Sequence, residues 1–373
     1  MKKAIVFALM FAASAQAQNA VRLVVTDVAT RQGDAIYVAG NFNNWNPKDE
    51  QYRLKPFGGG RQGVVIKDIP SGTYAFKFTR GSFERVECAA DGRDIADRTL
   101  EVNGDAVLEC KIVGWKDDYP EHPKRYTASP QVRIMDTAFA IPQLNRTRRI
   151  WVYLPKGYAA SSKTYPVLYM EDGQNLFNEQ TAFAEEWGVD EALDSMQRTG
   201  KECIVVGIDN GGAHRMNEYD PYDQDKYGKG EGIQYVDFLV HTLKPYIDGK
   251  YKTKKGPEYT YTAGSSMGGL ISLYAIMQYP QVFGGAGVFS PSLWIAPQMF
   301  DEAAKFRTVS PVKIYFYAGS KESATMVSDM EKMEDLLSKR SNIQILSTVF
   351  PLGQHNEKYW RQAFPAFYQF IVE

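Results

Sequence analysis

The chain has 373 residues, of which 44% are hydrophobic and 13% aromatic, and its formal net charge is -1. This length favours two domains, each able to bury a core, and the hydrophobic fraction argues against a disordered chain. The 43 basic and 44 acidic residues nearly cancel, which argues against nucleic acid or an anionic membrane as the main partner. We therefore expect a ligand that is neutral or modestly charged.

The first 17 residues have the parts of a secretory signal peptide. A basic start at Met1-Lys-Lys is followed by an apolar stretch over 4–13 and by the small-residue pattern Ala15-Gln-Ala17. We expect cleavage after Ala17 and export to the periplasm or the medium. The residue directly after the cleavage point is Gln18 and not a cysteine, so a lipid anchor is not expected.

Three cysteines follow this segment: Cys88, Cys110 and Cys203. An oxidising compartment permits a disulfide between Cys88 and Cys110, while three buried thiols are an equally compatible alternative. No Cys/His spacing resembles a zinc site, and the chain has only four histidines. We expect neither a metal nor another cofactor.

Residues 18–115 contain short strand-like segments separated by glycine and proline turns. This pattern predicts a small all-β, immunoglobulin-like sandwich with antiparallel strands at 22–25, 35–38, 63–66, 74–79 and 106–112. The polar, proline-bearing stretch over 116–130 has no periodicity and is typical of a linker.

Residues 131–373 alternate between apolar strand segments and helical patterns, which predicts an α/β domain with a mostly parallel sheet. The expected strands are 149–154, 166–170, 203–208, 259–263, 312–318 and 343–350. The expected helices are centred on 185–197, 233–247, 267–278 and 326–339. The methionine stripe Met326, Met330 and Met333 in the last of these favours a core-facing helix side.

The strand-like stretch 258–263 leads into Gly264-Ser-Ser266-Met-Gly268 and then into a helical pattern. A tight strand-to-helix turn of this kind presents a serine as a nucleophile, and glycine at both flanks leaves room for it. The turn also points the Met267 amide toward a developing oxyanion. We predict that Ser266 is the nucleophile of an α/β-hydrolase.

In the α/β-hydrolase layout the acid and the base follow the serine in chain order. His355 is the only histidine after Ser266, and it follows the last predicted strand. The acid should follow the penultimate strand, which favours Glu322. Asp301, Asp329 and Glu331 are its rivals, the last two lying on the solvent side of a predicted helix.

A second oxyanion donor should come from the loop after an early strand. The strand over 166–170 ends near a glycine turn, so the amide of Gly173 or Gln174 is the candidate. Asp172 precedes the serine in the chain, and we expect it to stabilise this turn.

From about residue 132 onward the sequence resembles the esterase D family of α/β-hydrolases, which includes carbohydrate esterase family 1 and the siderophore trilactone esterases. The matching segments are "VLYMEDGQNLF", "GIDNGGAHRMNEYDPY", "YTAGSSMGGLISLYAIMQYPQVFGGAGVFSPSLW", "YFYAGSKES" and "GQHNEKYW". The resemblance implies triad roles for Ser266, Glu322 and His355, with glutamate where many relatives carry aspartate. It also implies that Trp294, Arg215 and Tyr219 border the substrate pocket.

The N-terminal segments "IYVAGNFNNWNP" and "GTYAFKFTRGSF" are similar to starch- and glycogen-binding modules of families 20 and 48. The resemblance implies that Trp45 offers a flat surface to a sugar ring and that Lys77 bonds hydroxyl groups. Phe83 stands where the glycogen-binding pattern has its second tryptophan. A purely structural module beside the esterase is the alternative.

Together these features predict an exported serine esterase that acts on feruloyl or acetyl esters of plant cell-wall carbohydrate. Its partner would be a small-molecule or oligosaccharide ester, with a polysaccharide as a further candidate. Hydrolysis of a catecholate siderophore trilactone is one alternative. An inactive carbohydrate-binding protein is the other, although the complete Ser, Glu and His set speaks against it.

Overall fold

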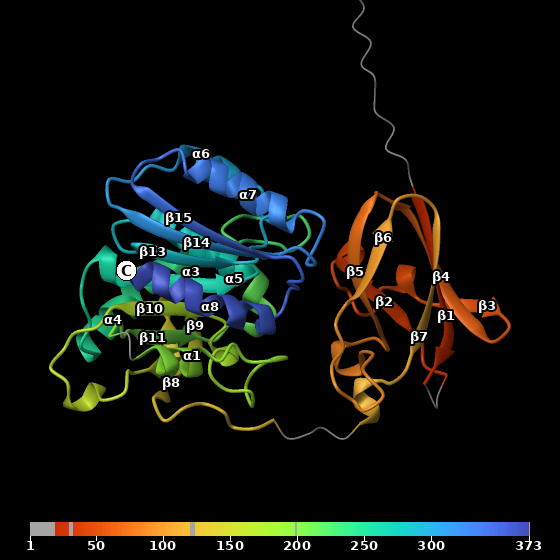
Figure 1. The fold of residues 1–373 in the computed structure, drawn as a ribbon, viewed down its shortest axis with the longest axis horizontal. Coiled ribbons are helices and arrows are strands. Elements are labelled where there is room, and N and C mark those ends of the chain that lie inside the picture. Colours follow the sequence, from red (N-terminus) through yellow and green to blue (C-terminus); the bar gives the residue numbers. More distant parts are fainter. Residues whose placement is uncertain (1–18, 30–32, 120–123, 198–199, 373) are drawn as a thin grey trace, which may run out of the picture. The chain divides into compact units, whose positions relative to one another are not determined.

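A computed structural model describes most of the chain, namely residues 19–29, 33–119, 124–197 and 200–372 (Figure 1). The expected signal peptide at 1–17 lies outside these ranges. The chain divides into two compact units, residues 1–122 and 123–373. Within the described ranges, no helix combines the length and the apolar character needed to cross a membrane.

The first unit is built from two β-sheets. One sheet has the strand order β3-β4-β1-β7 and the other the order β2-β5-β6. All of their pairings are antiparallel except that of β1 with β7, which is parallel. The strands are β1 (Asn19–Val28), β2 (Tyr37–Gly40), β3 (Lys55–Gly58), β4 (Arg61–Ile69), β5 (Gly72–Thr79), β6 (Arg98–Val102) and β7 (Ala106–Ile112).

Side chains from both sheets share one apolar core, so the unit is a β-sandwich. Leu23 of β1, Val38 of β2 and Phe76 of β5 are all fully buried in it. The five predicted strands are present, whereas β3 and β6 were not predicted, and the parallel β1–β7 pair corrects the expected all-antiparallel pairing. The immunoglobulin-like classification stays a prediction.

The cysteines form no disulfide. All three lie in the described part of the chain, and Cys88, Cys110 and Cys203 are buried free thiols. Burial raises the pKa of each thiol, which keeps it in the unreactive protonated form. The disulfide between Cys88 and Cys110 that the sequence permitted is therefore absent from this structure.

The stretch 116–130 is not a linker over its whole length, because both of its ends contact the adjoining units. At its start, Asp117 pairs with Arg80 of the first unit. Near its end, the Thr127 hydroxyl donates to Glu186 at 2.9 Å and the Ser129 amide donates to Asp190 at 2.7 Å, both within the second unit. Both ends of the predicted linker thus belong to the units that they adjoin.

The second unit contains an eight-stranded sheet with the order β15-β14-β13-β12-β10-β11-β9-β8. The six strands from β15 to β11 run parallel, and β9 and β8 complete the sheet in antiparallel pairings. The strands are β8 (Val132–Ile141), β9 (Arg146–Tyr153), β10 (Val167–Glu171), β11 (Ile204–Ile208), β12 (Thr260–Ser265), β13 (Gly285–Phe289), β14 (Val312–Gly319) and β15 (Ile343–Phe350).

Helices cover both faces of this sheet, with a separate apolar core under each face. One core packs α3, α5, α6 and α7 against the sheet, and the other packs α1 and α8 (Figure 1). The helices are α1 (Val189–Met196), α2 (Arg215–Glu218), α3 (Gly232–Phe238), α4 (Lys244–Lys250), α5 (Met267–Gln278), α6 (Gln298–Lys305), α7 (Met326–Leu337) and α8 (Glu357–Val372). This is an α/β-hydrolase-like fold with a large mixed, mostly parallel sheet, as the alternation of patterns predicted.

The predicted helix over 267–278 is confirmed residue for residue, and the methionine stripe of α7 is buried in the core. The predicted run over 233–247 is a continuous helical stretch that extends over 232–250. Sequence reasoning missed β8, β13, α2, α6 and α8. Two of these, β13 and α8, lie next to the candidate site described below.

Phe289 at the end of β13 provides a test of this packing. Its side chain is fully buried and its ring lies 4.9 to 6.1 Å from those of Trp187, Tyr315, Tyr317 and Phe367. We expect Phe289→Ala to lower the free energy of unfolding by about 3–5 kcal/mol in urea denaturation, because it leaves a cavity among these rings. Phe183→Ala is the matched control: its ring is 79% exposed, and its removal should change stability by less than about 0.5 kcal/mol. Equal effects of the two variants would contradict this packing.

Candidate active site

Ser266 lies at the turn between β12 and α5, as the motif predicted. Its backbone adopts φ 59° and ψ -119°, a conformation that side-chain-bearing residues rarely take. The neighbouring glycines allow this turn to form: a Cβ at Gly264 would lie 2.7 Å from the carbonyl carbon of Gly268. The Ser266 side chain is only partly buried, which leaves the hydroxyl open to a ligand.

Glu322 and His355 form a hydrogen-bonded pair. The Nδ1 atom of His355, in the loop between β15 and α8, lies 2.7 Å from Oε2 of Glu322, in the loop after β14. Glu322 is 7% exposed, and its Oε1 accepts from the Gly319 amide and from the Ser290 hydroxyl, each at 2.7 Å. The carboxylate therefore has three donors, which suits a buried acid that orients a histidine.

The rival acids lie elsewhere. Asp301 is exposed on α6, Glu331 is exposed on α7, and Asp329 lies half-buried on the same helix. None of them has a recorded contact with His355 among the described residues. The geometry thus brings Glu322 to the histidine, as the order of the loops predicted.

The Ser266 hydroxyl oxygen lies 3.1 Å from that of Ser292. A hydrogen bond from Ser266 to His355 is not among those formed in the described part of the chain. Such bonds are often long in a free enzyme and shorten when substrate binds. The Nδ1 contact with Glu322 leaves Nε2 of His355 as the nitrogen that can act as a base.

The amides expected to hold an oxyanion begin two helical segments. Met267 is the first residue of α5, and Gly173 and Gln174 begin a short 3₁₀ turn after β10. Amides at these positions have no partner inside their helix, so they are available to an anion. A Cβ at Gly173 would lie 2.7 Å from the Gly207 carbonyl carbon, so only glycine brings this loop so close to β11.

Asp172 stabilises the turn over residues 172–175, as expected; we call this turn the oxyanion loop for the role predicted for its amides. Its backbone has φ 55°, and its carboxylate accepts from Nε and Nη2 of Arg215 at 2.7 and 2.8 Å. Asn210 donates a further hydrogen bond at 2.7 Å. Arg215 therefore serves first to hold Asp172, and through it the loop.

The other two residues expected at the pocket differ in accessibility. Trp294 is 54% exposed, two residues after Ser292. Tyr219 has no exposed surface, packs against Tyr235 and accepts a hydrogen bond from the Asp172 amide at 3.3 Å. The prediction that Tyr219 borders the pocket is corrected: the side chain lies behind the oxyanion loop.

The three residues of the first unit that were expected to bind sugar have different surroundings. Trp45 is partly buried at a turn residue with φ 56°. Lys77 on β5 pairs with Asp97 at 3.1 Å, and Phe83 is 37% exposed. No recorded contact among the described residues joins the three.

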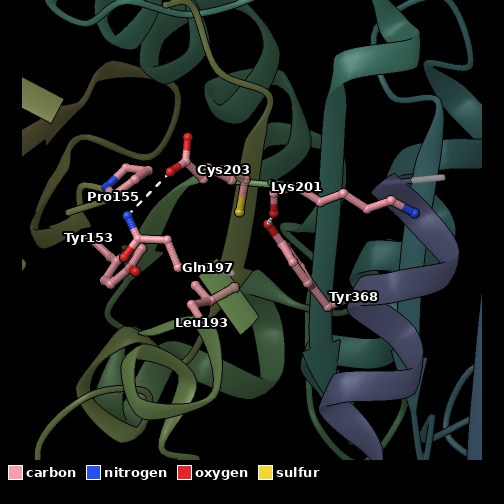
Figure 2. Close-up of a pocket in the computed structure, with 8 residues that line it drawn as sticks. Tyr153, Pro155, Leu193, Gln197, Lys201, Cys203 and Tyr368 are labelled. Carbon is pink, nitrogen blue, oxygen red and sulfur yellow. Dashed lines mark hydrogen bonds between the residues drawn. The ribbon is translucent and has the colours of Figure 1, made fainter. Parts of the chain in front are cut away.

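The structure also contains a small cavity of about 10 Å³, whose lining residues are drawn in Figure 2. It is lined by Tyr153, Cys203 and Tyr368, among others, at the start of β11. Because β11 and β12 both run parallel to β10, the start of β11 is remote from the end of β12. The cavity is therefore remote from Ser266. Burial raises the pKa of Cys203 to about 12.

Four residues at the site escaped sequence reasoning: Ser290, Ser292, Trp360 and Glu171. The segment "FSPSLW" had been noted only for Trp294. Trp360 lies in the unpredicted helix α8, where its ring meets the His355 ring edge-on at 5.1 Å. No three His, Cys, Asp or Glu side chains in the described ranges are grouped as a metal site requires.

Glu171 is a buried acid beneath the nucleophile turn. A Cβ at either Gly264 or Gly268 would lie 3.0 Å from the Glu171 Cβ. Burial raises the pKa of Glu171 to about 8, although a hydrogen bond from the Tyr235 hydroxyl works in the opposite direction. In the folded protein this carboxyl group is therefore protonated at neutral pH.

This shift predicts how stability depends on pH. Because the folded pKa is above the ordinary value of 4.5, unfolding releases a proton between the two values, so Glu171 lowers stability as pH rises through this window. We expect Glu171→Gln to gain a few kcal/mol relative to the wild type between about pH 5 and pH 8. Urea denaturation at both pH values measures this gain. A constant difference between the two proteins would contradict it.

A substitution of the acid tests its role. An amide in place of the Glu322 carboxylate would offer no negative charge to the His355 Nδ1–H, so the histidine would adopt the wrong tautomer for a base. We expect Glu322→Gln to lower kcat for a p-nitrophenyl ester by about 10²- to 10⁴-fold with the fold intact. Glu331→Gln, on the exposed side of α7, is the matched control and should keep wild-type kcat. An unchanged kcat in Glu322→Gln would rule out Glu322 as the acid.

Residues 141–371 match the model of a family described as "Putative esterase". The uncharacterized protein YbbA of Bacillus subtilis is 30% identical over 188 residues, which are 47% of this chain and 69% of YbbA. An endo-1,4-beta-xylanase/feruloyl esterase of Xylanibacter ruminicola is 26% identical over 162 residues, which are 41% of this chain and 21% of that protein.

Among solved structures, the enterobactin esterase FES from Shigella flexneri, crystallised in the presence of enterobactin, has a TM-score of 0.55 and 16% identity. The alignment covers 91% of this chain and 87% of FES. At this identity the likeness shows a shared fold. The family model and the YbbA relative go further: this chain belongs to the esterase family.

Proposed function

We propose that this protein is a serine esterase that hydrolyses feruloyl or acetyl esters of plant cell-wall carbohydrate through an acyl-enzyme. One observation carries the proposal: neighbouring parallel strands end at one edge of the sheet and deliver the three groups of a triad there. Ser266 follows β12, Glu322 follows β14 and His355 follows β15. The 2.7 Å contact between Glu322 and His355 supports the pairing of acid and base.

In the proposed reaction, Nε2 of His355 takes the Ser266 proton as the serine oxygen attacks the ester carbonyl carbon. The carbonyl oxygen becomes an anion and accepts hydrogen bonds from the amides of Met267 and of Gly173 or Gln174. The bond between the former carbonyl carbon and the sugar oxygen then breaks. His355 gives its proton to the departing sugar oxygen, which leaves as a hydroxyl.

Water completes the cycle. It attacks the acyl group on Ser266 while His355 removes its proton, and the serine leaves with that proton as the acid is released. Glu322 stays ionised throughout and stabilises the charged imidazole in each half of the reaction.

The charges around the site favour a neutral ester over a catecholate lactone. Arg215 is already paired with Asp172. Glu357, at the start of α8, is buried near His355. Burial raises the pKa of Glu357, and the nearby carboxylates of Asp172 and Glu185 raise it further. An anionic ligand would meet these carboxylates, while the arginine beside them is already neutralised by its partner.

Two further features support an acyl group such as feruloyl on a carbohydrate. The exposed ring of Trp294 follows the loop that contacts Ser266 and offers a flat apolar surface. The Xylanibacter ruminicola relative bears the name of a xylanase and feruloyl esterase.

The test incubates the purified protein in parallel with feruloylated xylan oligosaccharide, acetylated xylan and a catecholate trilactone. We expect the highest kcat/KM on a xylan ester and its loss in Ser266→Ala, because the variant has no nucleophile. Ser328→Ala, at an exposed serine of α7, is the matched control and should keep full activity.

Other outcomes would contradict the proposal in different ways. A clear preference for the trilactone would place the protein among siderophore esterases. Undiminished hydrolysis by Ser266→Ala would remove the serine mechanism, and no turnover of any ester would favour a carbohydrate-binding role.

A further inference from the structure

The turn that follows β13, residues Ser290, Pro291 and Ser292, contacts two members of the triad. We refer to it as the Ser-Pro-Ser turn. Ser290 is completely buried with φ 46°, a left-handed conformation that is costly for a residue with a side chain. Its amide donates to the Tyr317 carbonyl at 2.8 Å, which fixes the turn against β14. Strain of this kind persists only where the surroundings enforce it.

The first serine of the turn holds the acid. The Ser290 hydroxyl donates to Oε1 of Glu322 at 2.7 Å, and it accepts from Nε1 of Trp360 at 2.8 Å. Because the indole N–H occupies a lone pair of the Ser290 oxygen, the hydroxyl proton is directed toward Glu322. With Oε1 bound in this way, Oε2 of Glu322 is left for His355.

The second serine of the turn holds the nucleophile. The Ser292 amide donates to the Ser266 carbonyl at 3.1 Å, and the two hydroxyl oxygens are also 3.1 Å apart. Just before the turn, the Phe289 carbonyl accepts from the Ser266 amide at 2.9 Å. Ser266 is therefore bound to β13 and to the turn by two backbone hydrogen bonds and one contact of its hydroxyl.

We propose that Ser290 and Ser292 are positioning residues for ester hydrolysis, Ser290 acting on the acid Glu322 and Ser292 on the nucleophile Ser266. Trp360 orients the Ser290 hydroxyl from α8. The inference rests on the proposed serine esterase function and assigns the turn a role beyond backbone geometry. Neither serine needs to touch the substrate.

Substitutions at Ser290 separate its hydroxyl from its backbone. Ser290→Gly removes the hydroxyl and relieves the left-handed strain, whereas Ser290→Ala removes the hydroxyl and keeps the strain. We expect kcat to fall about 10- to 100-fold in both variants with little change in KM, since a hydrogen bond to a charged group is lost. Wild-type kcat in Ser290→Gly would show that only the backbone matters and would overturn the inference.

The pH profile of kcat/KM adds a readout that a structural role would not move. The charged groups facing His355 are Glu322, after β14, and Glu357, on α8, while Arg215 and Asp172 lie beside Glu357. Without the Ser290 hydroxyl, the negative charge of Glu322 has one donor fewer and attracts the protonated His355 more strongly. We expect the acidic limb of the profile to move to higher pH in Ser290→Gly, and an unmoved limb would count against the assignment.

A proton NMR signal tests the geometry without any substrate. The His355 Nδ1 proton in the bond to Glu322 gives a downfield resonance, which should shift in Ser290→Gly and in Trp360→Phe. Trp360→Phe keeps an aromatic ring beside His355 but has no N–H donor. Ser292→Ala should leave this resonance unchanged while lowering kcat by about 3- to 10-fold, because it loses one neutral hydrogen bond to Ser266. Ser328→Ala should change neither quantity.

These readouts keep the two hypotheses apart. If the wild type hydrolyses no ester, the proposed function fails, and the resonance alone still decides whether Ser290 and Trp360 position the acid. If the wild type is an active esterase that depends on Ser266, an unshifted resonance in both Ser290→Gly and Trp360→Phe would overturn the inference.

Discussion

The buried carboxylate of Glu322 is the constraint around which the candidate active site is arranged. A charge that is 7% exposed is costly unless donors surround it. Gly319, Ser290 and His355 supply those donors, from the end of β14 and from the loops that follow β13 and β15. The position of His355, and with it the base, thus depends on the correct pairing of these strands and not on the histidine loop alone.

Close backbone approach is the second requirement. Glycines at 264 and 268 let the nucleophile turn pack against Glu171, and Gly173 lets the oxyanion loop pack against β11. A methyl group at Gly264 or Gly173 would meet backbone atoms at 2.7 Å. The turn that carries Ser266 and the oxyanion loop are therefore both closely packed against the strands behind them. Beneath it, Glu171 adopts the neutral form because burial penalises its charge.

The proposed triad could be assigned from the sequence because the order of its members is a topological property. Parallel strands end at one edge, so the residues after successive strands converge there, and only His355 follows Ser266. The α/β alternation was likewise visible in the hydrophobic pattern, and α5 was located residue for residue.

The elements β13 and α8 were missed because their sequences contain residues that disfavour a strand or a helix. Strand β13 reads Gly-Ala-Gly-Val-Phe, and glycine is a poor strand former, yet a Cβ at Gly287 would lie 2.6 Å from the Phe367 ring of α8. Helix α8 contains Pro365, which hides it from a pattern-based search. Because neither element was predicted, the roles proposed for Ser290 and Trp360 had no basis in the sequence. The burial of Tyr219 depends on tertiary packing alone.

Formation of an acyl-enzyme at Ser266 is the central step of the proposed reaction, and trapping that intermediate tests it most directly. The protein is mixed with p-nitrophenyl acetate, quenched in acid within the first turnover and digested for peptide mass spectrometry. We predict one acetyl group on the peptide that carries Ser266. Rapid ester hydrolysis with no acetylated Ser266, or with the acetyl group on another residue, would contradict the account.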